Sequence, residues 1–327
     1  MGTTTSYAAR SGTAEPAVLA GRYRLDQLLG TGATGSVWTA VDRRSGEHVA
    51  VKVLAHRDGA TGPLLRFVRE QTVRVEHPHV AAPTGWAADD EHALLVMDLV
   101  RGGSVQDLLE EHGAVPPEWA AVLLRQLLEA LHAVHATGVV HRDVKPANLL
   151  LEPTGHGVPH LRLADFGVAT VTGEVRLTQV PGPVGTDGYM PPEQRRAEPP
   201  HPSHDLYAAG VVAGQLLSGG VPGAAVPPSP LTPVLRALTA PDPAARPGSA
   251  AAALALLART VPPTPPGLAA GRLAQHDGPG PSYPWVGDRV AARAARTAPV
   301  PAGLLAPALC LGSALALALL ALAVLLP

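Results

Sequence analysis

The sequence is poor in several residue types, and each scarcity narrows what the protein can be. Cys310 is the only cysteine, which excludes an intrachain disulfide framework and a zinc site built on cysteines. The formal net charge of −2 gives no basic field of the kind that attracts nucleic acid, so no nucleic-acid partner is expected. The 14 histidines include no pair at metal-ligand spacing flanked by carboxylates. These absences remove classes of protein without yet indicating one.

Lysine is the informative scarcity. Lys52 and Lys145 are the only lysines among 25 basic residues, Asn148 is the only asparagine, and isoleucine is absent. A composition that replaces lysine with arginine almost everywhere should keep lysine only where a compact ammonium is needed, because the guanidinium of arginine is a broad planar fork. Chance retention is the alternative. The two lysines are therefore candidates for chemistry before any motif is considered.

The chain divides by composition into four parts. Residues 1–21 are small and polar and predict a disordered N-terminus without the pattern of a signal peptide. Residues 22–260 predict a globular domain. Residues 261–302 are rich in Pro, Ala, Gly and Arg and predict a mostly unstructured linker. Residues 303–327 form the fourth part.

The fourth part contains a long uncharged run. Leu304 to Leu326 would span roughly 34 Å as a helix, which is enough to cross a hydrocarbon core of about 30 Å. A buried core helix is the alternative, but no core is expected beyond a Pro-rich linker. Arg289, Arg293 and Arg296 precede the run, so the positive-inside rule predicts a single-pass anchor in the cell membrane, with the lipid bilayer as a partner and the globular domain in the cytoplasm.

Within the globular part, strand signals precede helix signals. Short alternating runs of valine between residues 37 and 53 predict hairpin strands. Residues 117–137 carry apolar residues at helical spacing, with Glu118 near the start and Gly138 just past the end. The order predicts a strand-rich N-terminal part at about 22–100 and a helix-rich part at about 101–260.

A glycine-rich segment precedes the first lysine. Gly30, Gly32, Gly35 and Val37 fit the pattern G-x-G-x-x-G-x-V, in which glycines let the backbone approach a triphosphate and present N–H groups to it. Alone, the pattern also describes a hairpin turn. The strand that ends in V-A-V-K then places Lys52 beyond this loop, and the scarcity of lysine disfavours its interpretation as an ordinary surface residue.

The densest pattern runs from His141 to Asn148 and fits H-R-D-x-K-x-x-N in every fixed position. It holds Lys145 and Asn148, the second lysine and the only asparagine. Asp165 opens a D-F-G sequence further along, which alone would read as a turn. Together these motifs resemble the protein kinase family over roughly residues 22–260, and most closely the bacterial eukaryotic-like Ser/Thr kinases of the membrane-anchored type.

The resemblance implies roles for these residues. Asp143 would accept the proton of the substrate hydroxyl, and Lys145 would neutralise charge on the transferred phosphoryl group. Asn148 and Asp165 would bind Mg²⁺, with Mn²⁺ as an alternative. Lys52 would contact the α- and β-phosphates of ATP.

The partner of Lys52 should be a glutamate on the following helix. Glu70 is the expected partner and Glu76 is the alternative, because the stretch from Glu70 to His77 is about two residues shorter than the family usually shows. A solvated helix face is the plain interpretation of either glutamate.

The strand and hinge that join the two lobes are expected at residues 94–100. Met97 would guard the back pocket, backbone groups near Asp98 and Val100 would face adenine, and Leu150 would form the floor. The residues that the resemblance places around ATP are Leu29, Gly30, Gly32, Gly35, Val37, Ala50, Lys52, Met97, Asp98, Val100 and Leu150.

Further residues follow from the same resemblance. Thr186 resembles the threonine that touches the catalytic aspartate in the Ser/Thr class. Glu193 should form a buried structural pair with Arg246, and Asp205 should hold the backbone of the catalytic loop. Pro191 stands where the family usually has alanine, which stiffens the backbone there.

Regulation is also implied. Arg142 beside the catalytic aspartate resembles kinases that are activated by phosphorylation of a neighbouring loop, where the phosphate pairs with the arginine. Thr178 is the expected site, with Thr170 and Thr172 as alternatives. Phosphorylation in trans within a homodimer would supply the modification.

The sequence thus predicts an α+β, two-lobed protein kinase fold followed by a transmembrane helix. The expected function is transfer of the ATP γ-phosphoryl group to protein Ser and Thr hydroxyls. The segment 219–231 is shorter than the helical stretch that usually helps to dock substrates, which leaves protein docking open. A membrane-tethered pseudokinase scaffold and a small-molecule phosphotransferase of the same fold are the rival interpretations.

Overall fold

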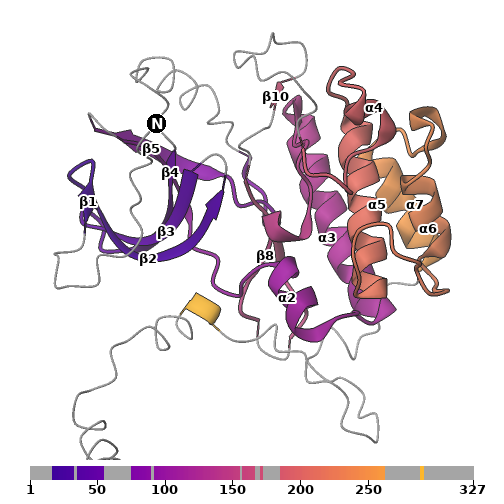
Figure 1. The fold of residues 1–327 in the computed structure, drawn as a ribbon, viewed down its shortest axis with the longest axis horizontal. Coiled ribbons are helices and arrows are strands. Elements are labelled where there is room, and N and C mark those ends of the chain that lie inside the picture. The colour runs from indigo at the N-terminus through magenta and orange to yellow at the C-terminus, as the bar shows by residue number, and fades with distance from the viewer. Residues whose placement is uncertain are drawn as a thin grey trace, which may run out of the picture. The chain divides into compact units, whose positions relative to one another are not determined.

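The computed structural model describes residues 17–32, 35–54, 75–89, 92–154, 157–165, 170–171, 185–261 and 288–290. A strand-rich part and a helix-rich part follow one another along the chain up to Arg289, and Figure 1 shows the sheet on one side and the helices on the other. The order of strands before helices that the sequence predicts is confirmed.

The N-terminal part is a six-stranded antiparallel sheet in the order β1-β2-β3-β4-β6-β5. The register places Val37 opposite Lys52, and Lys52 opposite Leu95. Valine-rich alternation gives these strands their two faces. The strands are β1 (Val18–Leu19), β2 (Tyr23–Gly32), β3 (Gly35–Asp42), β4 (His48–Leu54), β5 (Pro83–Ala88) and β6 (Ala93–Asp98).

The two faces of the sheet have different roles. One face carries a compact apolar core that includes Tyr23, Ala40, Val51 and Leu94. The other face carries Lys52, because side chains alternate along a strand and Lys52 neighbours the core residue Val51. The face that carries Lys52 also holds a second, smaller buried cluster, formed by Leu54, Ala93 and Leu95.

The domain begins earlier than the expected boundary at residue 22. Val18 pairs with Arg24 and Leu19 with Tyr23, and Leu19 is buried in the core of the sheet. Two apolar residues are too few to show a period in the sequence. The predicted disordered range 1–21 therefore includes β1, which the structure places at Val18–Leu19.

The C-terminal part is built around one long helix, α3. Pro117 is its first residue, where the missing N–H costs nothing, and Glu118 lies in the first turn, where a negative charge is favourable. The helix ends at Ala136, and Gly138 follows with φ +75°, so the helix expected over 117–137 is confirmed. The helices are α2 (Val105–His112), α3 (Pro117–Ala136), α4 (Pro192–Arg195), α5 (Pro202–Ser218), α6 (Thr232–Leu238) and α7 (Ala250–Thr260).

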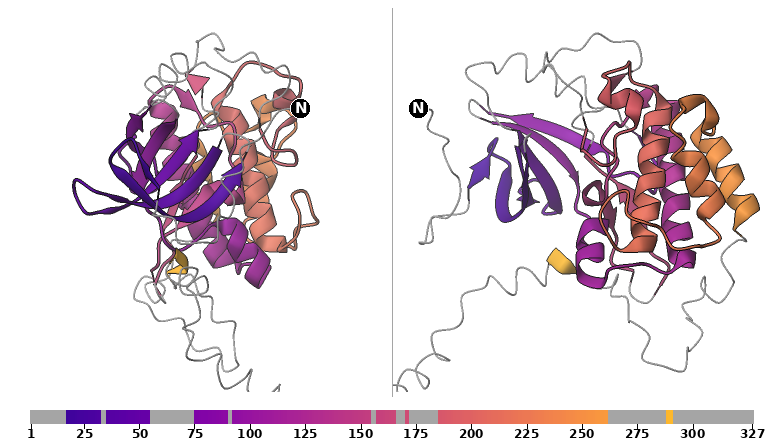
Figure 2. Two further views of the ribbon diagram at one scale, coloured as in Figure 1. Left: turned by 60° about the vertical axis from the view of Figure 1, so that its left-hand side comes forward. Right: turned by 45° about the vertical axis from the view of Figure 1, so that its right-hand side comes forward.

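Packing around α3 forms the larger core of the protein. Helices α5 and α7 contact α3, and the right-hand view of Figure 2 shows these helices side by side. Leu124, Leu128 and Leu131 of α3 are almost completely buried, with Leu206 of α5 and Leu257 of α7 in the same cluster. Burial of this apolar surface is the main stabilising contribution to the helical part.

Short strands and turns carry the chemical motifs at the edge of this core. Two small antiparallel pairs are formed, β7 with β10 and β8 with β9. Their bounds are β7 (Val139–Val140), β8 (Leu149–Leu151), β9 (Leu161–Leu163) and β10 (Thr170–Val171), and the 3₁₀ turns are η1 (Pro146–Asn148) and η2 (Pro243–Ala245).

Two further expectations concern the later part of the chain. Residues 219–231, between α5 and α6, contain no helix. Among the residues that the structure describes, no helix combines the length and hydropathy needed to cross a membrane. The predicted anchor at 303–327 lies outside the described residues, as does most of the predicted linker.

Candidate active site

The loop from His141 to Asn148 lies between β7 and β8, and one buried carboxylate holds its backbone. Asp205, in the first turn of α5, accepts hydrogen bonds from the backbone N–H of His141 at 2.9 Å and of Arg142 at 2.7 Å. It also accepts one from Nε2 of His135 at 2.8 Å. Asp205 is 1% exposed, and these donors replace the water that burial removed. Asp205 thus occupies the supporting position that the sequence predicts.

Opposing effects act on the Asp205 carboxyl. Burial alone would raise its pKa, but the hydrogen bond from His135, the electrostatic interactions with His135 and His141, and the hydrogen bond from the Arg142 N–H outweigh burial. The pKa of Asp205 therefore lies below its ordinary value. Asp205 is a carboxylate at neutral pH and can accept all of these bonds.

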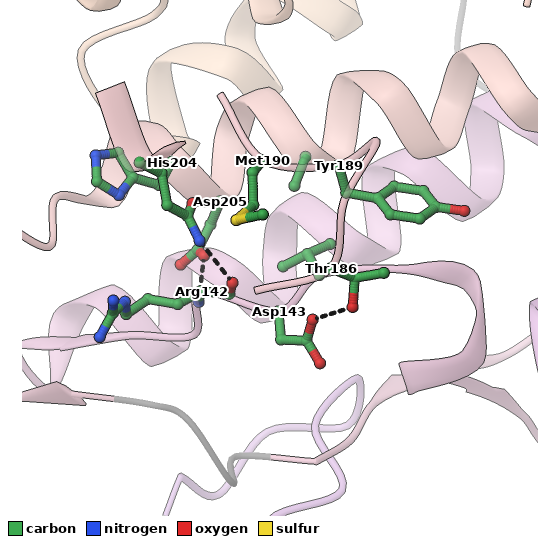
Figure 3. A pocket seen from close by; sticks show the side chains of 10 residues that line it. Arg142, Asp143, Thr186, Tyr189, Met190, His204 and Asp205 are labelled. Carbon is green, nitrogen blue, oxygen red and sulfur yellow. Dashed lines mark hydrogen bonds between the residues drawn. The ribbon is translucent and has the colours of Figure 1, made fainter. Parts of the chain in front are cut away.

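Arg142 has a backbone conformation that needs support. Its φ of +67° lies in the left-handed region, which costs a non-glycine residue on the order of 1 kcal/mol. Its N–H donates to Asp205, and its carbonyl accepts a hydrogen bond from Nε2 of Gln194 at 3.0 Å. Figure 3 shows both bonds. Gly185 packs tightly here, since a Cβ at this position would lie 2.7 Å from Gln194 Nε2.

Asp143, the next residue, carries a carboxylate that several donors hold. Thr186 Oγ1 donates to Asp143 Oδ1 at 2.7 Å, and Lys145 Nζ lies 2.7 Å from Asp143 Oδ2. Asn148 Nδ2 donates to the backbone carbonyl of Asp143 at 2.8 Å and to Oδ2 at 3.1 Å. Lys145 also donates to Thr186 Oγ1 at 2.8 Å. Asp143 and Thr186 lie in the pocket of Figure 3. The structure therefore brings together four residues that the sequence singled out.

Lys52 reaches from the sheet to the helical part. Its Nζ lies 2.5 Å from Oδ1 of Asp165, and Lys52 is 5% exposed. Asp165, which follows β9 by two residues, has φ +63°. A buried ammonium needs such a partner, because an unpaired charge would be strongly destabilising. The pair thus brings together two motifs that lie far apart in the sequence: the strand that ends in V-A-V-K and the D-F-G sequence.

The glycine-rich segment forms the β2–β3 hairpin, with Gly30 opposite Val37 and Gly32 opposite Gly35. Gly35 has φ +143°, and an added Cβ would meet the carbonyl oxygen of Val53. Gly30 and Gly32 are different, because an added Cβ at either would meet no atom of the described residues within 4 Å. Packing against the described residues therefore accounts for Gly35, and the open space beside Gly30 and Gly32 fits the expectation that the backbone here approaches a ligand.

Apolar side chains gather where the two parts meet. Val100, Ala81 and Ala164 form a small buried cluster, and Leu150 packs against it half-buried. Ala50 lies opposite Met97 in the pairing of β4 with β6. The sequence analysis did not predict Ala81 or Ala164 as members of this cluster. The only signal for Ala164 was that a small residue directly precedes Asp165, and Ala81 had none. The other expected members, Leu29, Val37 and Met97, are half-buried.

An arginine that sequence reasoning missed anchors the hinge. Arg162 of β9 donates from Nη2 to Asp98 Oδ2 at 2.9 Å and to the Val80 carbonyl at 3.0 Å. Its Nη1 lies 3.3 Å from Glu152 Oε1. The sequence contains 23 arginines, and no local pattern distinguishes Arg162 from the others. Its contacts tie the end of β6 to the strand that leads to Asp165.

The expected pair between Glu193 and Arg246 is present and buried. Arg246 Nη1 and Nη2 lie 2.5 and 3.0 Å from the two carboxylate oxygens of Glu193. Burial would raise the pKa of Glu193, but the hydrogen bonds and charge of Arg246, with a smaller contribution from His204, lower it. Arg246 also stacks on Tyr207, with 4.9 Å from its guanidinium carbon to the ring centroid. The pair joins α4 to the turn before α7.

Several predicted residues lie outside the described part of the chain. These are Glu70, the expected partner of Lys52, and the expected phosphorylation site Thr178 with its alternative Thr172. The other alternative, Thr170, belongs to β10. Glu76, the alternative partner of Lys52, is exposed, while Lys52 contacts Asp165.

The fold and site define a two-lobed protein in which a sheet-borne lysine meets an aspartate of the helical part. A family model described as "Protein kinase domain" matches residues 23–228. The chain belongs to the protein kinase family.

Three curated proteins are similar to part of this chain. "Serine/threonine-protein kinase PkaA" of Streptomyces coelicolor is 39% identical over 215 residues, which are 62% of this chain and 39% of that protein. "Serine/threonine-protein kinase PknA" of Mycobacterium tuberculosis is 37% identical over 212 residues, which are 62% of this chain and 48% of that protein. "Serine/threonine-protein kinase PknL" of the same species is 34% identical over 218 residues, 65% of this chain and 54% of that protein. The chain spans about half the length or less of these relatives.

The donor set at the site fits a magnesium–nucleotide complex. Among the described residues there is no group of three or more His, Cys, Asp and Glu side chains that could hold a metal on their own. Mg²⁺ bound to a nucleotide needs only one or two protein carboxylates or amides, because phosphates and water supply the other ligands. Asp165 offers a carboxylate, and Asn148 offers its carbonyl oxygen, since its Nδ2 faces Asp143. These residues fit such a complex.

Proposed function

We propose that the chain is a Ser/Thr protein kinase that transfers the γ-phosphoryl group of ATP to Ser and Thr hydroxyls of proteins. The observation that carries the proposal is the Asp143 carboxylate, with Lys145 at 2.7 Å, Thr186 at 2.7 Å and Asn148 at 3.1 Å. A carboxylate fixed in this way beside an ammonium suits the orientation of a hydroxyl next to a phosphate.

In the proposed reaction Asp143 orients the substrate hydroxyl and accepts its proton. Lys145 places positive charge beside that carboxylate, where the phosphoryl group is transferred. Thr186 restrains both side chains through its hydroxyl. Bound Mg²⁺, or Mn²⁺ in its place, neutralises phosphate charge, and Asp165 and Asn148 are the residues proposed to hold it.

The nucleotide site lies on the face of the sheet that carries Lys52. The ammonium of Lys52 is proposed to bind the α- and β-phosphates, and Gly30 and Gly32 give the backbone room to approach them. The apolar cluster around Val100, with Leu150 beneath it, suits the flat adenine ring.

Phosphoryl transfer from radiolabelled ATP by the full chain tests this function. We expect the unaltered chain to label itself and a Ser/Thr peptide mixture. Asp143→Asn and Lys52→Met should each reduce the label by at least about a hundredfold. Asp26→Asn, at an exposed position of β2, is the matched control and should retain full label. Equal labelling by all four proteins would contradict the proposal.

A pseudokinase scaffold would require the loss of at least one residue of the chemical set. Lys52, Asp143, Asn148 and Asp165 are all present. The kinase interpretation is therefore favoured over the scaffold.

Membrane anchoring is a separate proposal. Leu304–Leu326 has the length and hydropathy of a single membrane span, and Arg289, Arg293 and Arg296 precede it, which supports a cytoplasmic kinase domain at the cell membrane. Fractionation of cells that express the full chain tests it. The unaltered chain should stay in the membrane fraction after alkaline carbonate washing, whereas Leu315→Arg combined with Leu317→Arg should release it. A chain that is soluble without these changes contradicts the proposal.

Activation by phosphorylation in trans between two copies is proposed on the position of Arg142. Its side chain belongs to the residue just before Asp143, and a phosphate at Thr178 would pair with it. Mass spectrometry after incubation with ATP should find phosphate at Thr178, and Thr178→Ala should lower activity. A fully active chain without any phosphate on residues 170–178 would rule this out.

A further inference from the structure

Two residues from the predicted linker lie against the kinase domain. The backbone N–H of Arg289 donates to the carbonyl oxygen of Arg101 at 2.9 Å. Nη1 of Arg101 lies 3.2 Å from Oδ2 of Asp288, and Nη2 of Arg289 lies 2.7 Å from Oε2 of Glu111. One backbone hydrogen bond is thus flanked by two ion pairs, between segments separated by more than 170 residues.

The order of the charges fixes the register of this contact. Asp288 faces the basic Arg101, and Arg289 faces the acidic Glu111. The opposite direction of the segment would place like charges together, which is destabilising. The complementarity therefore specifies one orientation of the segment on this surface.

Close approach of the segment depends on Gly103. Gly103 has φ +83°, and a Cβ there would lie 2.7 Å from Cδ of Arg289 and 3.1 Å from Oδ2 of Asp107. The aliphatic part of the Arg289 side chain thus crosses the domain at a position that has no side chain. Because the positive φ would strain any other residue at position 103, a substitution there would change the backbone as well as the docking contact.

We propose that Arg101, Gly103 and Glu111 form a docking site for the chain's own Asp288–Arg289 segment. This tail-docking site joins the end of the hinge to α2. Arg101 directly follows Val100, a member of the apolar cluster that the proposed function assigns to adenine. Docking of the tail therefore holds the hinge in its nucleotide-binding position, and this consequence rests on the proposed function.

The contact is suited to reversible engagement. All four charged side chains are partly exposed, between 26% and 54%, and exposed ion pairs stabilise only weakly and are screened by salt. Covalent connection to α7 makes docking intramolecular, so weak contacts suffice to hold the segment. The contact can thus be released by a competing charge without unfolding of the domain.

Charge reversal in the full 327-residue chain tests the proposal. The variants are Arg289→Glu, Glu111→Arg and the two combined, with Arg259→Glu at an exposed position of α7 as the charge-matched control. Hydrogen exchange reports docking through the Arg289 amide, and titration with a fluorescent ADP analogue reports nucleotide affinity. Each single variant should expose the Arg289 amide and weaken nucleotide binding about threefold, the size expected for loss of exposed ion pairs. The combined variant should restore both, and Arg259→Glu should change neither.

The outcomes separate the two proposals. An Arg289 amide that exchanges as fast as an unstructured peptide in the unaltered chain overturns the docking site. Loss of docking in the single variants with unchanged nucleotide affinity overturns the coupling to the hinge. A chain that docks its tail but binds no nucleotide overturns the proposed kinase function and leaves the docking site supported.

Discussion

At the scale of single residues, Thr186 joins two groups that phosphoryl transfer would use together. Its hydroxyl donates to Asp143 and accepts from Lys145. We expect Thr186→Ala to lower kcat for a peptide substrate roughly 10- to 100-fold, because the carboxylate loses its orientation, with a smaller change in KM for ATP. Thr186→Ser keeps the hydroxyl and should retain most activity. Steady-state kinetics measures both, and an unchanged kcat in Thr186→Ala would show that the hydroxyl has no positioning role.

Asp205 shows how a buried charge can serve a loop. We expect Asp205→Asn to lower the free energy of unfolding by about 2–4 kcal/mol at neutral pH, because the N–H groups of His141 and Arg142 lose a charged acceptor. The pKa of Asp205 is lowered in the folded state from 3.8, so its contribution is fully present above that value. The contribution is lost as the pH falls through the lower, folded-state pKa.

Urea unfolding at neutral pH and at several values below about 3.8 measures this difference. The gap in stability between the unaltered chain and Asp205→Asn should shrink as the pH falls. Asp26→Asn, which changes an exposed carboxyl, should unfold as the unaltered chain does at neutral pH. A gap that widens on acidification would mean that the folded-state pKa is raised instead.

At the scale of elements, β9 links the hinge to the site. Arg162 in the middle of this strand contacts Asp98 at the end of β6 and the carbonyl of Val80. We expect Arg162→Met to raise KM for ATP about three- to tenfold and to lower stability by about 1–2 kcal/mol, because the carbonyl loses its donor and the hinge loses an anchor. Arg236→Met, at an exposed position of α6, is the control. An unchanged KM would assign Arg162 a purely structural role.

Local signals in the sequence predicted the elements that have a strong period. The helix over 117–137 and the hairpin strands from residue 37 to 53 have bounds close to those of α3, β3 and β4. The motif residues Lys52, Asp143 and Asp165 stood out because they belong to fixed spacings or to rare residue types. A hydrophobic period or a fixed motif spacing can be recognised in a single sequence because it involves residues that are close together along the chain.

Contacts between distant segments were not predictable in the same way. Arg162, Gln194 and His135 support the site through hydrogen bonds to residues 52 to 82 positions away in the sequence. No local pattern marks these pairs. The strand β1 was too short to show alternation. The tail-docking site pairs charges that are common on any surface, so only the folded chain distinguishes them.

At the scale of the whole molecule, the two cores of the kinase domain differ in extent. Among the described residues, the sheet holds two small buried clusters, one on each face, whereas the helical core collects residues from α2, α3, α5, α6 and α7. Local opening requires more free energy where more apolar surface is buried. The sheet should therefore open more readily than the helices, and the Lys52–Asp165 pair is a link between the two parts that a nucleotide would reinforce.

Amide hydrogen exchange along the full chain tests this order. Without nucleotide, we expect the amides of β2–β4 to exchange at least about tenfold faster than those in the centres of α3 and α5, which corresponds to about 1.4 kcal/mol of opening free energy. A non-hydrolysable ATP analogue with Mg²⁺ should slow exchange in β4 and in residues 141–148 but leave α7 unchanged. In Lys52→Met the order without nucleotide should persist, while the protection by nucleotide should disappear. Equal exchange rates in the sheet and in α3 would contradict the expectation that the sheet opens more readily than the helices. Full protection by nucleotide in Lys52→Met would contradict the role of Lys52 as a link between the two parts.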